Sequence, residues 1–183
     1  MLLLDQYPLA SYVAETVPEA LLEAFSVSWR YGKIGVPEPT VKGALLIFNS
    51  PVQINPLVTL DDARDLVLVR HKINLSDWGS DYGENALRKM WLTLRTGLPA
   101  HIAIAQCGLI LDAEETRYGG SAIHLPTMTI VGFSGQNERI DYLIAEAVLV
   151  SLIGLGNILT HAQRRATEGT ATFNRRTFPA PPS

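Results

Sequence analysis

The 183-residue sequence has a single cysteine, Cys107, and so cannot form a disulfide bond within the chain. Its fold therefore does not depend on an oxidising compartment, and a buried structural thiol is favoured over a nucleophilic cysteine. The common catalytic and metal-binding motifs HExxH, CxxC, P-loop and GxSxG are also missing, and the four histidines lie far apart. These absences predict a cytoplasmic protein without a metal site.

The sequence also lacks a secretory signal and a clear membrane span. Residues Met1–Leu4 are apolar, but they have no basic region and Asp5 follows at once. The longest apolar run, 143–160, contains Glu146, Asn157 and two glycines, which argues against insertion into a membrane. We therefore expect no membrane partner.

Positive charge is scarce except at the C-terminus. Residues 160–183 carry four arginines and one glutamate, a charge of +3, and the net charge of −3 leaves −6 for the rest of the chain. A nucleic-acid-binding protein needs a dense basic face with a matching motif, and this short basic segment offers neither. We expect no nucleic-acid partner. The basic segment is interpreted either as an arm that packs on the acidic surface of a neighbouring subunit or as a solvated tail.

Composition predicts one domain with a sizeable core. Hydrophobic residues make up 47% of the chain and charged residues only 18%, which is too apolar for a disordered protein. We expect the domain to span residues 1–168. Residues 169–183, which end in Phe-Pro-Ala-Pro-Pro-Ser, are expected to form an extended or disordered tail.

Hydrophobic periodicity and turn residues predict helices that alternate with strands. Thr16 and Glu19 have the spacing of a capping box, with Pro18 in the first turn, which predicts a helix from 16 to about 31. The continuous apolar run within 41–48 predicts a central strand that is buried on both faces. The other expected elements are a helix over 59–74, a helix over 84–95, strands within 101–111, a β-rich stretch over 123–133 and a last helix over 137–165.

The stretch from Tyr118 to Glu146 has a recognisable order of elements. The Gly119-Gly120 turn precedes the β-rich stretch, and Ser134-Gly135 follows it before a long apolar helix that carries Asp141. This order resembles the haem-degrading-domain family (GlcG/HbpS-like proteins). The resemblance implies an α/β (α+β) fold with the order α-β(2)-α-β(3)-α, in which a central antiparallel sheet is flanked by helices.

A second segment resembles one branch of the same family. Arg70-His71-Lys72-Ile73-Asn74, followed by Trp78-Gly79-Ser80, is similar to the Arg-x-Lys-x-Asn helix and aromatic-Gly-x-Ser segment of an uncharacterised branch. In that branch a histidine is expected before the Gly-Gly pair and another after the helix aspartate, where this chain has Tyr118 and Tyr142. We therefore expect no resident cofactor, and haem, if it binds, is expected to bind weakly.

The candidate site combines residues from both segments. Arg70 and Asn74 share one side of the expected helix over 59–74, so a guanidinium there would pair with an anion. The expected ligand-binding residues are Arg70, Asn74, Gly119 and Gly120, and the expected catalytic residues are Tyr118, His124 and Asp141. The alternative is that Arg70 and Asp141 form a structural ion pair.

Two functions follow from these residues. The first is a small-molecule-binding protein of the haem-degrading-domain family with a polar or anionic organic ligand. The second is a cofactor-independent isomerase, cyclase or lyase of specialised metabolism on the same scaffold, so the sequence leaves open whether the protein is an enzyme. The last helix is apolar on almost every side, and we expect a homo-oligomer through its face at Leu149, Val150, Leu152 and Ile153.

Overall fold

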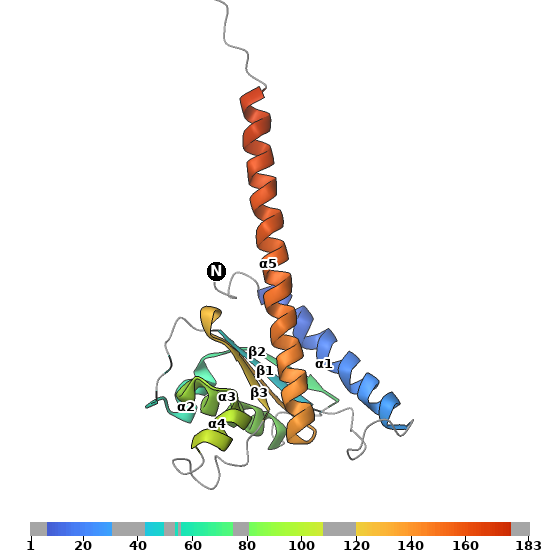
Figure 1. Ribbon diagram of the computed structural model, residues 1–183, viewed down its shortest axis with the longest axis vertical. Helices are drawn as coiled ribbons and strands as arrows, with labels where there is room; N and C mark the ends of the chain where they lie inside the picture. Colours follow the sequence, from blue (N-terminus) through green and yellow to red (C-terminus); the bar gives the residue numbers. More distant parts are fainter. Residues whose placement is uncertain are drawn as a thin grey trace, which may run out of the picture.

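A computed structural model describes residues 7–30, 43–49, 54, 56–74, 81–107 and 120–176. Figure 1 shows a sheet covered by helices on both faces, with one long helix that extends well beyond it. The elements are α1 (Tyr7–Arg30), β1 (Gly43–Asn49), α2 (Leu60–Asp65), β2 (Val67–Ile73), α3 (Asp81–Thr96), α4 (Ala100–Cys107), β3 (Ser121–His124), the 3₁₀ helix η3 (Leu125–Thr127), β4 (Thr129–Ser134) and α5 (Glu138–Arg176).

The sheet has four antiparallel strands in the order β2-β1-β4-β3. Strand β1 is hydrogen-bonded on both sides, and its residues 43–48 are all buried. Both the central strand expected within 41–48 and the expected antiparallel sheet flanked by helices are therefore confirmed.

Alternate side chains of β1 face two separate cores, as the two-residue period of a strand requires. Leu45 and Ile47 pack in one core with residues of α1 and α5, while Leu46 and Phe48 pack in the other with residues of α2 and α3. The sheet thus divides the molecule into an α1/α5 layer and an α2/α3 layer.

The helix expected over 59–74 is wrong in its second half. Thr59 caps α2 through a capping box with Asp62, but α2 ends at Asp65 and the chain continues as strand β2. Val69 and Ile73 are buried on β2 while Arg70 is exposed, and the β-branched residues suit this half-buried strand. Arg70 and Asn74 consequently lie on a strand and not on a helix.

Two further segments differ from the expectation. The segment from His101 was expected to form strands, but its described part, up to Cys107, belongs to helix α4. Ala100 and Ala103 pack at helical spacing against Leu92 of α3. Residues 108–111 lie outside the described residues. Helix α1 begins at Tyr7, and Thr16 is not an N-cap, since its hydroxyl donates a hydrogen bond to the carbonyl oxygen of Tyr12 at 2.8 Å. The apolar residues before Thr16 lengthen the helix.

The β-rich stretch forms a hairpin. Strands β3 and β4 pair through the register Ser121↔Gly132 to His124↔Thr129, and η3 joins them, with Met128 in the left-handed region at φ 47°.

Helix α5 begins directly after Asn137, whose side-chain oxygen accepts a hydrogen bond from the backbone N–H of Ile140 at 3.1 Å. It continues to Arg176, past the expected start of the tail at residue 169, and residues 177–183 lie outside the described residues. Its first part packs on the sheet and on α1, whereas its later part projects away from the domain (Figure 1).

The oligomer face expected on this helix needs correction. Leu149 and Leu152 are buried in the α1/α5 core, and Ile153 packs against that core. Of the four residues named, Val150 is the one with a largely exposed side chain, at 62%. Most of the expected face therefore contacts the protein's own core, because the helix presents it to the sheet.

The stretch Glu138–Ala162 of α5 is long and apolar enough to cross a membrane by length and composition alone, although core helices of soluble proteins pass the same test. Its first turns pack on the sheet as a core helix does, and 33% of its most apolar window is buried. The expectation of no membrane partner stays a prediction.

We predict that Gly132→Ala destabilises the fold by about 1–3 kcal/mol, because a Cβ at Gly132 would lie 2.6 Å from the backbone oxygen of Ala86 on α3. Gly154→Ala is the matched control: it has nothing within 4 Å and should stabilise α5 by roughly 0.5–1 kcal/mol. Urea unfolding of both variants measures the difference. Equal stability of the two variants would show that α3 does not pack this closely on β4.

Candidate functional site

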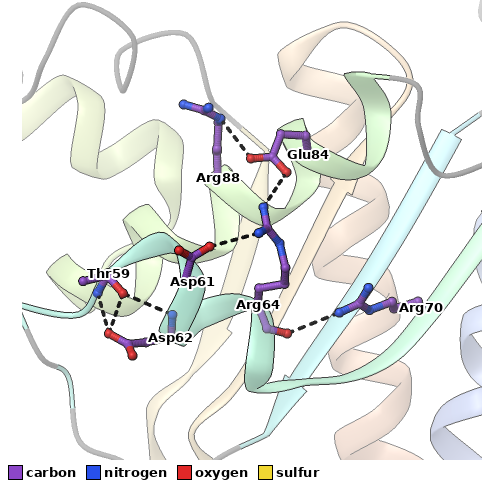
Figure 2. Close-up of polar contacts among 7 residues, drawn as sticks. All are labelled: Thr59, Asp61, Asp62, Arg64, Arg70, Glu84 and Arg88. Atoms are coloured by element: carbon purple, nitrogen blue, oxygen red, sulfur yellow. Dashed lines mark hydrogen bonds and ion pairs between the residues drawn. The ribbon is translucent and has the colours of Figure 1, made fainter.

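The structure does not bring Arg70 and Asp141 together. Arg70 lies on β2, where its guanidinium donates a hydrogen bond to the backbone oxygen of Arg64 at 3.3 Å (Figure 2). Asp141 lies on α5 and is paired with Lys89. The expected Arg70–Asp141 ion pair is therefore wrong, and so is a single pocket built from both residues.

Arg70 borders a small cavity of about 150 Å³ between β2 and α3. Arg64 and Glu84 also line this cavity and form a salt bridge of 3.1 Å. Two further salt bridges extend the cluster, Arg64 with Asp61 at 2.9 Å and Arg88 with Glu84 at 3.5 Å (Figure 2). The cluster lies at the surface, where each such ion pair contributes about 1 kcal/mol or less. The cavity has room for a small anion but is much smaller than a typical ligand pocket.

Asn74 does not join Arg70 at this cavity as the expected helix would have required. Four residues along a strand span about 13 Å, whereas residues four apart on a helix lie side by side. Asn74 directly follows the last residue of β2, its backbone is in the left-handed region at φ 50°, and its side chain is exposed. The strand therefore separates the two expected ligand-binding residues.

His124 and Gly120 lie at opposite ends of β3. The Nδ1 atom of His124 is 2.8 Å from the hydroxyl of Thr127, which is in turn 2.8 Å from the hydroxyl of Thr129. Tyr118 and Gly119 lie outside the described residues. His124 and Asp141, two of the expected catalytic residues, do not form a pair for proton transfer, because His124 is bonded to Thr127 and the carboxylate of Asp141 is bonded to Lys89 and Gln136.

Asp141 belongs to a buried ion pair that the sequence analysis missed. The ammonium group of Lys89 donates hydrogen bonds to Oδ2 of Asp141 at 2.6 Å and to the carbonyl oxygen of Phe133 at 2.8 Å. The other carboxylate oxygen accepts the N–H of Gln136 at 2.8 Å. Lys89 and Asp141 are only 5% and 2% exposed, so the pair ties α3 to β4 and to the first turn of α5.

Burial sets the protonation behaviour of this pair. Desolvation raises the pKa of Asp141 to about 6, against the opposing effect of the Lys89 charge. Desolvation likewise lowers the pKa of Lys89, against the opposing effect of Asp141. Both groups are shielded from solvent, which fits a structural pair.

The sequence did carry a signal for Lys89. Ala86, Lys89, Met90 and Thr93 recur at the spacing of the core-facing side of α3, and all four are buried. A lysine on the core side of an amphipathic helix requires a buried partner, and Asp141 is the acidic residue of the apolar helix α5 that meets it.

Gly120 allows the chain to pack closely against Asp141 of this ion pair. It has φ 99°, and a Cβ there would lie 2.5 Å from the Cβ of Asp141 and 3.2 Å from the backbone nitrogen of Tyr142. Its close backbone approach is thus to helix α5. Next to it, the hydroxyl of Ser121 bonds to the hydroxyl of Thr93 and accepts the N–H of Ala100 at 2.9 Å, which joins β3 to α3 and α4.

A larger groove lies where α4 meets the first turn of α5. It has a volume of about 420 Å³ and is lined by His101, Asn137, Glu138, Arg139 and Tyr142. The rings of His101 and Tyr142 lie 4.1 Å apart between centroids, at 57° to each other. The groove is next to Asp141 along the chain, and Gly120 lies close to the backbone of Tyr142. Its residues other than Tyr142 were not singled out from the sequence.

The polar groups of the groove differ in their availability. Nδ1 of His101 is shielded from solvent and has no hydrogen-bond partner among the described residues. Burial raises the pKa of Tyr142, and a hydrogen bond to Glu146 raises it further. Tyr142 therefore stays a neutral phenol at physiological pH. Among the described residues, no group of three or more His, Cys, Asp or Glu side chains could hold a metal ion.

We predict that Lys89→Met destabilises the fold by about 3–5 kcal/mol, because it leaves the Asp141 carboxylate buried without its partner. The double variant Lys89→Met/Asp141→Leu should lose much less than the sum of the two single variants. Arg88→Met, which removes a surface pair on the same helix, should cost about 1 kcal/mol or less. Additive losses in urea unfolding would contradict the coupling of Lys89 and Asp141.

We also predict that Asp141 titrates with a midpoint near 6 in the folded protein, compared with 3.8 for an unperturbed aspartate. Between these values the folded state keeps a proton that the unfolded state has released, so this group's contribution to stability falls as the pH rises from about 4 to 6. The carboxyl carbon shift of Asp141 in a pH titration by NMR measures the midpoint. A midpoint at or below 3.8 would mean that the Lys89 charge outweighs burial.

Comparisons with known proteins bear on the fold. Neither a protein-family model nor a curated protein matches the chain. The crystal structure of Klebsiella pneumoniae protein ORFY, family-model DUF336, is similar at 16% identity and a TM-score of 0.44, over 76% of this chain and 87% of that chain. The crystal structure of the PduOC:heme complex is similar at 17% identity and a TM-score of 0.42, over 75% of this chain and 93% of that chain.

Proposed function

We propose that the protein binds a polar or anionic organic small molecule in the groove between α4 and the first turn of α5. The observation that carries this proposal is the ring pair of His101 and Tyr142 beside Arg139 in a groove of about 420 Å³. That volume lies within the range of small-molecule sites, about 300–1,000 Å³. It is also nearly three times the volume of the cavity at Arg70.

The groups around the groove favour a planar ligand with a carboxylate. The two rings offer an apolar wall for a flat molecule. The guanidinium of Arg139 and the positive end of the α5 dipole favour a negative charge, and Glu138 at the same rim offsets part of it.

Tyr142 does not support haem as a resident cofactor. A tyrosine that binds haem iron does so through its oxygen, and the hydroxyl of Tyr142 is engaged with Glu146, with its pKa raised. Tyr142 therefore does not fit an axial ligand, and Tyr118 lies outside the described residues.

The enzyme alternative draws no support from Asp141. A general base must reach the proton that it removes, and the carboxylate of Asp141 is buried and bonded to Lys89 and Gln136. We therefore propose ligand binding, and not proton transfer at Asp141, as the function of this region.

We predict that benzoate binds the groove more tightly than benzyl alcohol, which has the ring without the charge, and than acetate, which has the charge without the ring. Arg139→Ala should weaken benzoate binding about tenfold and leave benzyl alcohol unaffected, since it removes one charged contact. Tyr142→Ala should weaken both aromatic probes. Two-dimensional NMR titrations, followed at the backbone signals of 101 and 137–142, measure these affinities.

Arg70→Ala is the matched control, because it removes an arginine from the other cavity. It should leave benzoate binding unchanged. If Arg70→Ala abolishes binding and Arg139→Ala does not, the ligand site is the cavity between β2 and α3, and the proposed groove is wrong.

A further inference from the structure

The later part of α5 continues the core-facing stripe of the helix beyond the core. Ile144, Val148 and Leu152 on this stripe are buried against the sheet and α1. Leu155 and Leu159 follow at helical spacing, but they are 37% and 43% exposed, because the helix has by then left the domain (Figure 1). Nothing in the described part of the chain covers the end of this stripe.

Further apolar residues of α5 are exposed: Ile158 lies beside Leu155, and Val150 lies on the opposite side of the helix. Val150 and Ile158 are 62% and 64% exposed, and a Cβ at Gly154 would have no atom within 4 Å. The projecting part is amphipathic, with Leu155, Ile158 and Leu159 on one side and Asn157, Thr160 and His161 on the other. The domain's own core covers the apolar side over the first half of α5, and the continuation of that side past the domain is an exposed apolar surface that fits a protein partner.

The distribution of charge indicates which partner binds this apolar surface. The apolar part of α5 is followed by the exposed side chains of Arg164 and Arg165, and residues 160–183 together carry +3. Helix α1 has the opposite charge. Its exposed residues Glu15, Glu19 and Glu23 recur every four residues and so form one acidic stripe, with no lysine or arginine between residues 7 and 29.

The acidic stripe begins beside the exposed part of α5. Ala10, Val13 and Ala14 of α1 belong to the same core cluster as Val148 and Leu152 of α5, and Figure 1 shows the start of α1 beside α5 near the point where α5 leaves the domain. The exposed side chain of Tyr12, at 61%, lies in the same turns of α1 as Glu15. A partner helix laid along the exposed part of α5 would thus reach the acidic stripe.

We propose that this partner is a second copy of the chain, paired so that the two α5 helices run antiparallel through their exposed apolar parts. With the two-fold axis near Ile158, Arg165 of each copy lies about 10 Å past the axis, at 1.5 Å per residue, near the level where α1 begins in the other copy. Each copy then supplies both the basic and the acidic surface, as a two-fold interface requires. An anionic membrane would attract the arginines but repel the α1 glutamates.

The test uses the full chain and measures molar mass by light scattering at micromolar concentration. The unchanged protein should have twice the mass of one chain. Arg164→Glu/Arg165→Glu and Glu15→Arg/Glu19→Arg should each weaken dimerisation about tenfold or more through like-charge repulsion. Combining all four substitutions restores opposite charges and should restore the dimer. Ile158→Asp should give a monomer with an unchanged circular dichroism spectrum.

Asp65→Arg is the control for charge reversal, because Asp65 is exposed on α2 in the other layer of the fold. This substitution should leave the dimer intact. The proposal would be overturned if the protein without substitutions is a monomer, or if the Ile158→Asp variant is still a dimer. Monomers that float with vesicles of anionic phospholipid would assign the surface to a membrane. Failure of the combined variant to recover the dimer would show that α1 and α5 do not meet across the interface.

Discussion

The ion pair between Lys89 and Asp141 is the contact through which the separate layers of this fold are joined. Its two side chains come from α3 and α5, on the two sides of the sheet, and the remaining hydrogen bonds go to the backbone at Phe133 and Gln136 at the end of β4. Two buried charges cost several kcal/mol each to desolvate, so they are tolerated only when they satisfy one another. The left-handed Gly120 allows β3 to approach this pair closely.

Helix α5 combines a structural part with an exposed part. Its first turn supplies Asp141 to the ion pair and Tyr142 to the groove at α4, so the geometry of the proposed ligand site depends on the same contact that holds the layers together. Its later part leaves the domain with apolar side chains still exposed on more than one side. The two proposals therefore concern different ends of one helix and are independent of each other.

The candidate site was predictable only in part. Asp141 and Gly120 were singled out from the sequence, and the structure places both in packing contacts, Asp141 with Lys89 and Gly120 with α5. A buried aspartate and a left-handed glycine look the same in sequence whether they face a ligand or a helix. Arg70 was assigned to the wrong element, because a short capped helix and the strand after it together mimic one longer helical pattern. His101 was missed because its segment was expected to form strands.

The sequence by itself determined the central buried strand, the capped start of α2, the amphipathic α3 and the long apolar last helix, because each depends on local periodicity or on a local cap. Only the tertiary structure decided that Asp141 would be the partner of Lys89, that α4 would be helical and that His101 would meet Tyr142. These contacts join residues far apart in the chain, and packing against distant elements outweighs local propensity there.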